Sequence, residues 1–298
     1  MADVVVALDA GGTKLLGGLV TEAGEILARD QRPTPRADGR CDPGFVALQG
    51  LAASLVEQAA ELGHQVRGVG LGVAEYVSGD QLTSAEVFDW DRQPAEILAA
   101  LVDGPVSVET DVRSAAIAET VGRAPQQGCL LYISWGTGLS STVVIDGRCH
   151  EGRRGEALAL GEWPVHPDVD RSWTGNLEQF ASGHGMGARF ASATGQPATG
   201  ADVAAAAAAG DPAAEGVLAS AARALAAALA SLVQVLDPDL VVLGGGIGVN
   251  GGRLPDLVAE AMPTWLHRPD PPRVERSTAG ADAGLLGAAV VGWQKLRR

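Results

Sequence analysis

Asp9-Ala10-Gly11-Gly12-Thr13-Lys14 stands between two apolar runs, Val4–Leu8 before it and a second run that begins at Leu15. Apolar runs on both sides of a Gly-Gly-Thr stretch predict two strands joined by a tight turn. Glycine tolerates positive φ and lets the backbone approach a ligand, so the N–H groups of such a turn can surround phosphate oxygens. The opening of the chain therefore predicts a phosphate-binding hairpin.

A second hairpin of the same kind lies farther along the chain. The strand-like run Leu130–Ser134 leads into Gly136-Thr137-Gly138, and a strand-like run resumes over Thr142–Ile145. Two Gly/Thr turns in one chain suggest two halves of a fold that close on one anion.

Between the hairpins, an acidic residue follows a predicted strand. Val106–Val108 predicts a strand and Val112–Val121 a helix, so Asp111 stands on the first turn of that helix. Open α/β sheets bind their ligands at the carboxyl ends of strands. Asp111 is therefore a candidate for ligand chemistry, and an ordinary helix N-cap is the alternative interpretation.

Five motifs of this chain resemble, in order, those of the ROK family, which comprises repressors, open reading frames and sugar kinases in the actin, hexokinase and heat-shock ATPase fold group. Together the matches span nearly the whole chain. They are Leu8–Lys14 for the first phosphate motif, Glu109-Thr110-Asp111 for the catalytic motif, Gly136–Gly138 for the second phosphate motif, Asp239–Gly246 for the adenosine motif, and the C-terminal run Asp282–Ala289.

The resemblance implies an α/β, two-lobed, actin/hexokinase-like (ribonuclease H-like) fold with the nucleotide in the interlobe cleft. We expect a small N-terminal lobe over residues 1–112, rejoined by a C-terminal helix over 284–298, and a larger lobe over 113–283. No linker-like Ser/Gly/Pro tract separates these lobes in the sequence, so we expect them to share a hinge.

The resemblance also implies an ATP-dependent sugar kinase that uses Mg²⁺. Asp111 would accept the proton of a sugar hydroxyl. Asp9 would hold Mg²⁺, through water, because this ion keeps much of its hydration shell; a turn-stabilising aspartate is the alternative. Lys14 would add positive charge or would be a solvated strand residue. The residues expected to contact the nucleotide are Asp9, Gly11, Gly12, Thr13, Lys14, Gly136, Thr137, Gly138, Gly244, Gly245 and Gly246.

One competing motif concerns the nucleotide. Gly246–Gly251 matches the Gly-x-Gly-x-x-Gly fingerprint of dinucleotide-binding folds after a predicted strand. It comes late in the chain, and the Arg253-Leu254-Pro255 that follows does not let a helix open at the third glycine. We therefore favour the adenosine motif.

Composition and charge exclude several classes of protein. The chain has 298 residues, 46% hydrophobic residues and a net charge of −14. So acidic a surface disfavours nucleic acid and anionic membranes as partners. The longest uncharged helical run, Ala224–Leu236, is short for a membrane span. Three widely spaced cysteines and the absence of a basic, apolar leader predict a cytoplasmic protein, and the resemblance leaves room for a homodimer.

The sequence departs from the family pattern in the sugar-binding region. Family sugar kinases resemble one another in a Glu-x-Gly-His segment followed by a zinc-binding cysteine run. A gap-free count from Gly155 places Ala159 at the glutamate and Glu162 at the histidine, and Thr110 replaces an asparagine. The zinc cysteines are absent, so we expect no structural zinc. Glu178 keeps its place as a candidate sugar ligand, with a surface helix residue as the alternative.

These departures enrich the predicted sugar pocket in carboxylates. The expected substrate-binding residues are Thr110, Asp111, Glu162, Glu178 and Glu75, and Glu86 lies in the same loop region as Glu75. Clustered carboxylates repel one another unless a cation lies among them. The carboxylates therefore suggest an amino sugar, such as kanosamine (3-amino-3-deoxyglucose) or glucosamine, as the substrate, and the resemblance implies that it would be phosphorylated at O6.

Two alternatives remain open from the sequence. The first is a glucokinase that acts on a neutral hexose. The second is a non-catalytic sugar sensor, as in the family's repressors; these carry a DNA-binding segment before the first phosphate motif, where this sequence has only eight residues before Asp9.

Overall fold

The computed structural model describes residues 1–37, 39–121, 128–266 and 270–297. They form two compact units. The first unit comprises Met1–Ala124, Cys149–Ala157 and Ala279–Arg298, and the second comprises Pro125–Arg148 and Leu158–Thr278. The sequence-based division after residue 112 differs from these units, because the helix that follows Thr110 and residues 149–157 pack within the first unit.

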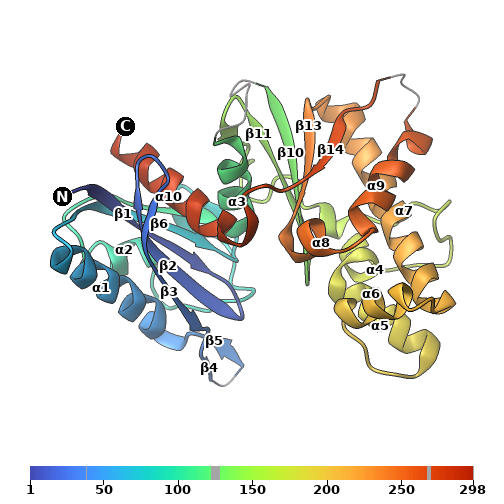
Figure 1. Ribbon diagram of the computed structural model, residues 1–298, viewed down its shortest axis with the longest axis horizontal. Helices are drawn as coiled ribbons and strands as arrows, with labels where there is room; N and C mark the ends of the chain where they lie inside the picture. The colour runs from blue at the N-terminus through green and yellow to red at the C-terminus, as the bar shows by residue number, and fades with distance from the viewer. Residues whose placement is uncertain (38, 122–127, 267–269, 298) are drawn as a thin grey trace. The chain divides into compact units, whose positions relative to one another are not determined.

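The first unit is built on a five-stranded sheet of order β3-β2-β1-β6-β9 (Figure 1). β1 pairs antiparallel with β2 and parallel with β6, which in turn pairs parallel with β9. The strands are β1 (Asp3–Ala10), β2 (Lys14–Thr21), β3 (Ile26–Pro33), β6 (Gln65–Val73) and β9 (Val106–Thr110), with two short hairpins, β4 (Arg36–Ala37) with β5 (Arg40–Cys41) and β7 (Val77–Ser78) with β8 (Gln81–Leu82).

Helices cover both faces of this sheet. Alternate residues of a strand point to opposite faces. Val4 and Val6 therefore join the cluster that contains α1 (Val46–Glu61), whereas Val5 and Ala7 join the cluster that contains α10 (Ala283–Leu296). This explains why β1 reads as a continuous apolar run. The unit also contains α2 (Pro94–Leu98) and α3 (Asp111–Thr120).

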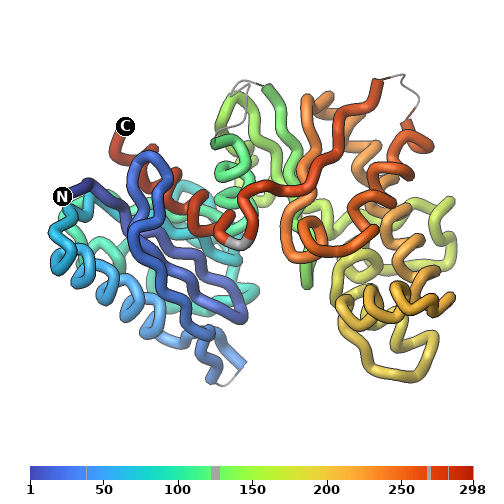
Figure 2. Tube along the Cα trace, in the orientation of Figure 1, coloured from blue at the N-terminus to red at the C-terminus, as the bar shows by residue number. Residues whose placement is uncertain are grey.

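Both ends of the chain build the first unit. Figure 2 shows α10 beside strands from the beginning of the chain. A Cβ added at Gly70 of β6 would lie 1.9 Å from the carbonyl oxygen of Ala288, so the helix rests on the strand with backbone against backbone. Only glycine fits at this contact.

The start of α1 is irregular. A 3₁₀ turn, η1 (Pro43–Phe45), comes first, and Asp42 and Phe45 both adopt left-handed backbone conformations. The Asp42 carboxylate accepts hydrogen bonds from the N–H groups of Ala47 (2.7 Å) and Leu48 (3.0 Å). Asp42 therefore caps a helix that begins at Val46.

The second unit repeats the strand arrangement of the first. Its sheet has the order β12-β11-β10-β13-β14, with an antiparallel hairpin followed by parallel pairs. The two hairpins predicted from the Gly/Thr turns are therefore confirmed as β1–β2 and β10–β11. The strands are β10 (Cys129–Trp135), β11 (Leu139–Ile145), β12 (Arg148–Cys149), β13 (Leu240–Gly244) and β14 (Arg273–Arg276).

Helices of the second unit pack against Leu131, Ile133 and Trp135 of β10 in one large core. They are α4 (Leu177–Ala181), α5 (Gly183–Thr194), α6 (Gly200–Ala208), α7 (Pro212–Leu236), α8 (Gly245–Asn250) and α9 (Leu254–Ala261), with the 3₁₀ turns η2 (Leu160–Glu162) and η3 (Met262–Trp265); a further turn, η4 (Gly280–Asp282), precedes α10 in the first unit.

The helix α7 contains the uncharged run Ala224–Leu236 and extends from it towards the N-terminus as far as Pro212. By length and composition it reaches what a membrane span needs, but 67% of its apolar window is buried inside the structure. Leu225, Leu229 and Val233 are among its residues in the core. This burial is typical of the core helix of a globular unit.

Candidate functional site

The carbonyl groups of the turn between β1 and β2 accept hydrogen bonds from residues that follow β3. Thr34 Oγ1 donates to the oxygen of Gly11 (2.6 Å), Arg36 Nη2 to that of Gly12 (2.9 Å), and the Thr34 N–H to that of Thr13 (3.1 Å). Within the described residues, the N–H groups of Gly12 and Thr13 have no acceptor. Unpaired N–H groups in such a turn form a concavity for an anion.

Asp9 lies at the end of β1, next to this turn. The carboxylate is half-buried, and burial raises its pKa to about 6, while the positive charge of Lys14 lowers it. Mg²⁺ is usually bound through one or two carboxylates together with phosphate oxygens and water. A hard carboxylate beside a phosphate-binding turn fits that requirement, so Asp9 would hold the ion, which would neutralise charge on the phosphates.

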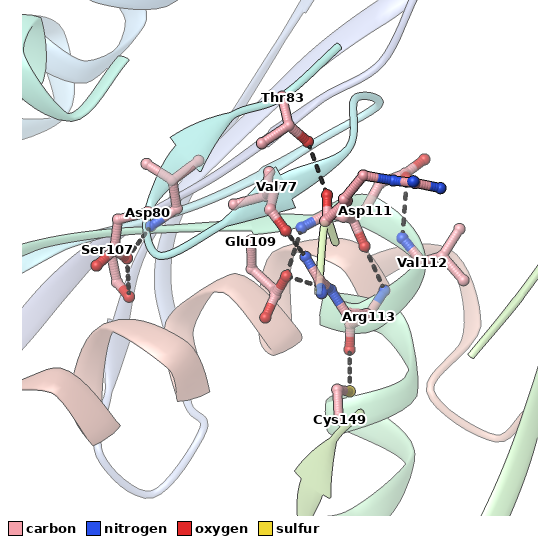
Figure 3. Close-up of polar contacts among 12 residues, drawn as sticks. Val77, Asp80, Thr83, Ser107, Glu109, Asp111, Val112, Arg113 and Cys149 are labelled. Atoms are coloured by element: carbon pink, nitrogen blue, oxygen red, sulfur yellow. Dashed lines mark hydrogen bonds and ion pairs between the residues drawn. The ribbon is translucent and has the colours of Figure 1, made fainter. Parts of the chain in front are cut away.

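Asp111 is not the N-cap of α3. That position belongs to Thr110, whose Oγ1 accepts the Arg113 N–H (3.0 Å), while the Asp111 carboxylate accepts the N–H of Val112 (2.8 Å; Figure 3). Burial, together with the negative charges of Asp9 and Glu75, raises the pKa of Asp111 to about 7. Asp111 is therefore a carboxyl group whose pKa lies near neutrality, as a general base requires.

Sequence reasoning missed the ion pair that flanks Asp111. Arg113, 4% exposed, places Nε 2.5 Å from Glu109 Oε1 and donates from Nη2 to the oxygen of Val77 (2.5 Å; Figure 3). Burial raises the pKa of Glu109, and Arg113 opposes this shift. The pair fixes the start of α3. The four-residue spacing of Glu109 and Arg113 is the signal that could have revealed it.

Glu75 does not offer its carboxylate to a sugar. It is 6% exposed, and both oxygens accept hydrogen bonds from the loop that contains residues 84–88. Thr110, predicted to contact the substrate, likewise uses its hydroxyl to cap α3. The charge of Glu75 still acts on Asp111, as its effect on the pKa shows.

In the second unit, the turn between β10 and β11 is held by the first residues of α5. The N–H groups of Gly183 and His184 donate to the oxygens of Gly136 (2.8 Å) and Thr137 (3.1 Å), and the Gly136 N–H donates to the oxygen of Gly138 (3.0 Å). As in the first unit, the turn is fixed through its carbonyl groups.

The predicted adenosine motif lies beside this turn. β13 pairs parallel with β10 and aligns Gly244 with Ser134, and a Cβ at Gly136 would lie 3.6 Å from the nitrogen of Gly246. A Cβ at Gly244 would lie 2.0 Å from the hydroxyl of Tyr132, so only glycine fits. The competing fingerprint, Gly246–Gly251, falls largely inside α8 rather than between a strand and a helix.

Glu178 and Glu162 both belong to the second unit and are linked through the start of α4. Glu178 Oε2 accepts the N–H of Leu139 (2.7 Å), the residue that follows the turn Gly136–Gly138. Glu162 is exposed, and its Oε2 accepts a hydrogen bond from Asn176 Nδ2 (3.2 Å). Asn176 caps α4, the helix that carries Glu178.

The segment expected in place of the zinc motif is held by other contacts. The backbone pairs at Pro164 and Asn176, and the ring of Trp173 meets Phe180 edge-on at 5.1 Å. Among the described residues, no group of three or more His, Cys, Asp or Glu could hold a metal ion. The predicted site residues thus form two sets: Asp9–Lys14, Glu75, Thr110 and Asp111 in the first unit, and Gly136–Gly138, Glu162, Glu178 and Gly244–Gly246 in the second.

Known proteins resemble this chain over nearly its whole length. The chain is 31% identical, over 314 residues, to a glucokinase of Streptomyces coelicolor, and the match covers 96% of each protein. The ROK hexokinase from Thermus thermophilus is 31% identical with a TM-score of 0.85 over 99% of both chains. A ROK family glucokinase from Streptomyces griseus, solved with glucose and AMPPNP, is 30% identical with a TM-score of 0.77, over 98% of this chain and 99% of that one.

These structures confirm the predicted α/β fold class with two sheets. The model of the ROK family matches residues 5–295, nearly the whole chain. Together with relatives of this identity and coverage, that match shows that the chain belongs to the ROK family.

Proposed function

We propose that this ROK family sugar kinase transfers the γ-phosphoryl group of ATP to O6 of a hexose that carries a free ammonium group, such as glucosamine or kanosamine. The observation that carries the proposal is Asp111 itself. Asp111 directly follows β9 and is not the N-cap of α3, and its carboxyl group has a pKa of about 7. A base with that pKa is half ionised at neutral pH and can accept the hydroxyl proton.

Phosphoryl transfer depends mainly on positioning and charge stabilisation. The unpaired N–H groups of Gly12 and Thr13 suit phosphate oxygens, and so does the fixed turn Gly136–Gly138. Asp9 would hold Mg²⁺. The backbone at Gly244–Gly246, which approaches that turn closely, suits the adenosine.

The preference for an amino sugar is supported by negative charge. Asp9 and Glu75 both raise the pKa of Asp111, so an additional cation near these groups would be favoured. Glu162 and Glu178 add two carboxylates in the second unit. Glu75 acts here through its charge alone, because its oxygens are occupied by the loop.

The alternative is a neutral hexose, which the similarity to glucokinases supports. ADP release with Mg·ATP, measured across glucose, mannose, glucosamine, N-acetylglucosamine and kanosamine, separates the two. We expect the highest kcat/KM with glucosamine or kanosamine. Equal or better turnover of glucose would contradict the amino-sugar preference.

Two controls complete the experiment. Asp111→Asn keeps the size of the side chain and removes the base, so turnover should be lost while sugar binding persists. A 6-deoxy analogue of the best substrate should bind without being phosphorylated if O6 is the acceptor. Tight sugar binding by the wild type without turnover of any sugar would instead indicate a sugar sensor.

A further inference from the structure

Three carboxylates stand at one edge of the first sheet. β1, β6 and β9 are parallel neighbours, and Ala10, Val73 and Thr110 are aligned in register at their carboxyl ends. Asp9 lies at the end of β1, Glu75 two residues after β6, and Asp111 directly after β9. Because parallel strands end at the same edge of a sheet, the strand that precedes Glu75 lies between the strands that lead to the proposed metal ligand and the proposed base.

Glu75 differs from the other two in its hydrogen bonds. Its Oε1 accepts the N–H groups of Val87 (2.5 Å) and Phe88 (2.7 Å), and its Oε2 accepts the N–H of Glu86 (2.9 Å) and the hydroxyl of Ser84. One buried carboxylate thus closes the loop 84–88 around itself. Hydrogen bonds to a charged acceptor are about twice as strong as neutral ones.

The loop 84–88 reaches the predicted phosphate-binding turn between β1 and β2. Val87 Cγ1 would lie 3.2 Å from a Cβ placed at Gly12, so its side chain packs against that glycine. On its other side, Phe88 is buried and stacks on Trp90 with 4.4 Å between the ring centroids. Trp90 Nε1 donates to the oxygen of Asp42 (2.9 Å), which ties this aromatic pair to the start of α1. Ala85 and Glu86 remain exposed at the tip of the loop.

We propose that Glu75 is a positioning residue, which folds the loop 84–88 into the wall that joins the phosphate turn to the general base and presents Ala85 and Glu86 to the acceptor sugar. This wall determines the affinity for the hexose. Val87 links the wall to the turn between β1 and β2, which would receive the phosphate. This inference rests on the proposed role of Asp111.

Glu75 also acts on Asp111 through its charge. Asp9 from β1 and Glu75 from the end of β6 are charged groups that raise the pKa of Asp111. At this end, α10 presents Gly284 to Asp9 and Gly287 to α3, neither of which carries charge. Neutralising Glu75 therefore removes one of two negative charges that raise the pKa of Asp111, and the ionised base forms at lower pH.

The test is Glu75→Gln. The carboxamide has a single oxygen, so at least two of the four donors lose their acceptor, whichever way the side chain lies. We expect the KM for the hexose to rise about 10-fold, which corresponds to the loss of about one charge-assisted hydrogen bond. The acid limb of kcat/KM should also move to lower pH, which a merely structural role would not produce.

Asp80→Asn is the matched control. Asp80 accepts a hydroxyl, from Ser107 (3.0 Å), a backbone N–H, from Val108 (2.9 Å), and the ammonium of Lys295, but does not contact the loop 84–88 among the described residues. We expect this variant to lose thermal stability and to keep the hexose KM within about twofold and the acid limb in place. The same KM and pH changes in both variants would overturn the proposal.

Two further measurements keep the proposal testable if Glu75→Gln does not fold or the wild type shows no turnover. Ser84→Ala removes one donor and should raise the hexose KM, or its dissociation constant, by about threefold, and Ser84→Thr should restore it. In the protein without ligands, the emission of Trp90, taken as the difference from Trp90→Phe, should shift to longer wavelength in the Ser84→Ala variant. Unchanged emission and unchanged affinity would overturn the role of Glu75, whereas absent turnover alone would contradict only the proposed function.

Discussion

Gly284, the second residue of α10, lies against the carboxylate of Asp9: a Cβ at Gly284 would stand 2.5 Å from Oδ2 and 2.9 Å from Oδ1. The last helix of the chain thereby forms one side of the proposed metal site. Real Cβ atoms do not approach oxygen so closely, so any larger residue at this position must displace either the carboxylate or the helix.

Gly284→Ala should therefore impair Mg²⁺ use. We expect kcat to fall about 10- to 100-fold, because a shift of the order of 1 Å at a reacting centre has an effect of this size. The Mg²⁺ concentration that gives half-maximal activity should rise. Gly216→Ala is the matched control, since a Cβ at Gly216 of α7 meets nothing within 4 Å; it should retain activity and gain slightly in stability. Unchanged Mg²⁺ dependence of Gly284→Ala would contradict the assignment of Asp9.

The activity should depend on the ionisation of Asp111. Its pKa is raised from 3.8 to about 7, and the base must be ionised to accept a proton. We expect kcat/KM to increase with pH up to about 7 and then to level off. A profile measured at saturating Mg·ATP over pH 5–9 tests this, and an acid limb centred below pH 5 would exclude Asp111 as the group that titrates.

Asp111→Asn should lose activity and gain stability. A general base typically accelerates a reaction about 10²- to 10⁴-fold, so its removal should lower kcat by about this factor. Because the folded-state pKa of Asp111 lies above the unfolded value of 3.8, its ionisation opposes folding. The unfavourable contribution is absent below pH 3.8 and complete above about pH 7. The melting temperature of the variant should thus exceed that of the wild type at pH 8, with the difference shrinking towards pH 4. A difference that does not change with pH would refute the burial argument.

Much of the first unit could be predicted from the sequence because its signals are local. The run Val4–Leu8, the Gly-Gly-Thr turn and the run from Leu15 predicted β1 and β2, and the position of Asp111 after a strand was also predicted. The hydrogen bonds of Glu75 could not be, since they depend on a loop that returns to the strand end only in the folded chain. The same holds for the contact between Gly284 and Asp9, whose partners stand at opposite ends of the sequence.

In the second unit, the amino-acid composition of two elements prevented their prediction from the sequence. α8 begins at Gly245, and a run of glycines predicts a turn rather than a helix. β14 is only four residues long, Arg273–Arg276, and three of them are charged, so no apolar run marks it. Tertiary pairing with β13 forms this strand, which sequence periodicity cannot reveal.

Removing Arg113 alone should destabilise the protein more than removing the whole ion pair. Arg113→Met leaves Glu109 buried without its partner, which typically costs ~3–5 kcal/mol. Arg113→Met combined with Glu109→Gln should recover much of that loss, because no buried charge remains. Urea unfolding of the single and double variants measures the difference. Equal stabilities would show that water reaches Glu109, against the 4% exposure of the Arg113 side chain that covers it.

The packing of α10 against β1 and β2 has a consequence for how the protein is made. Leu285, Ala288 and Ala289 of α10 cover Val5, Ala7, Leu16 and Val20, which are synthesised long before α10. During translation this apolar face stays open until α10 has been synthesised, long after the residues of α1 that cover the opposite face. Between the synthesis of β2 and that of α10 the nascent chain therefore carries an uncovered hydrophobic surface, which chaperones would be expected to bind. Truncation within the last helix should yield insoluble protein rather than a weakened enzyme.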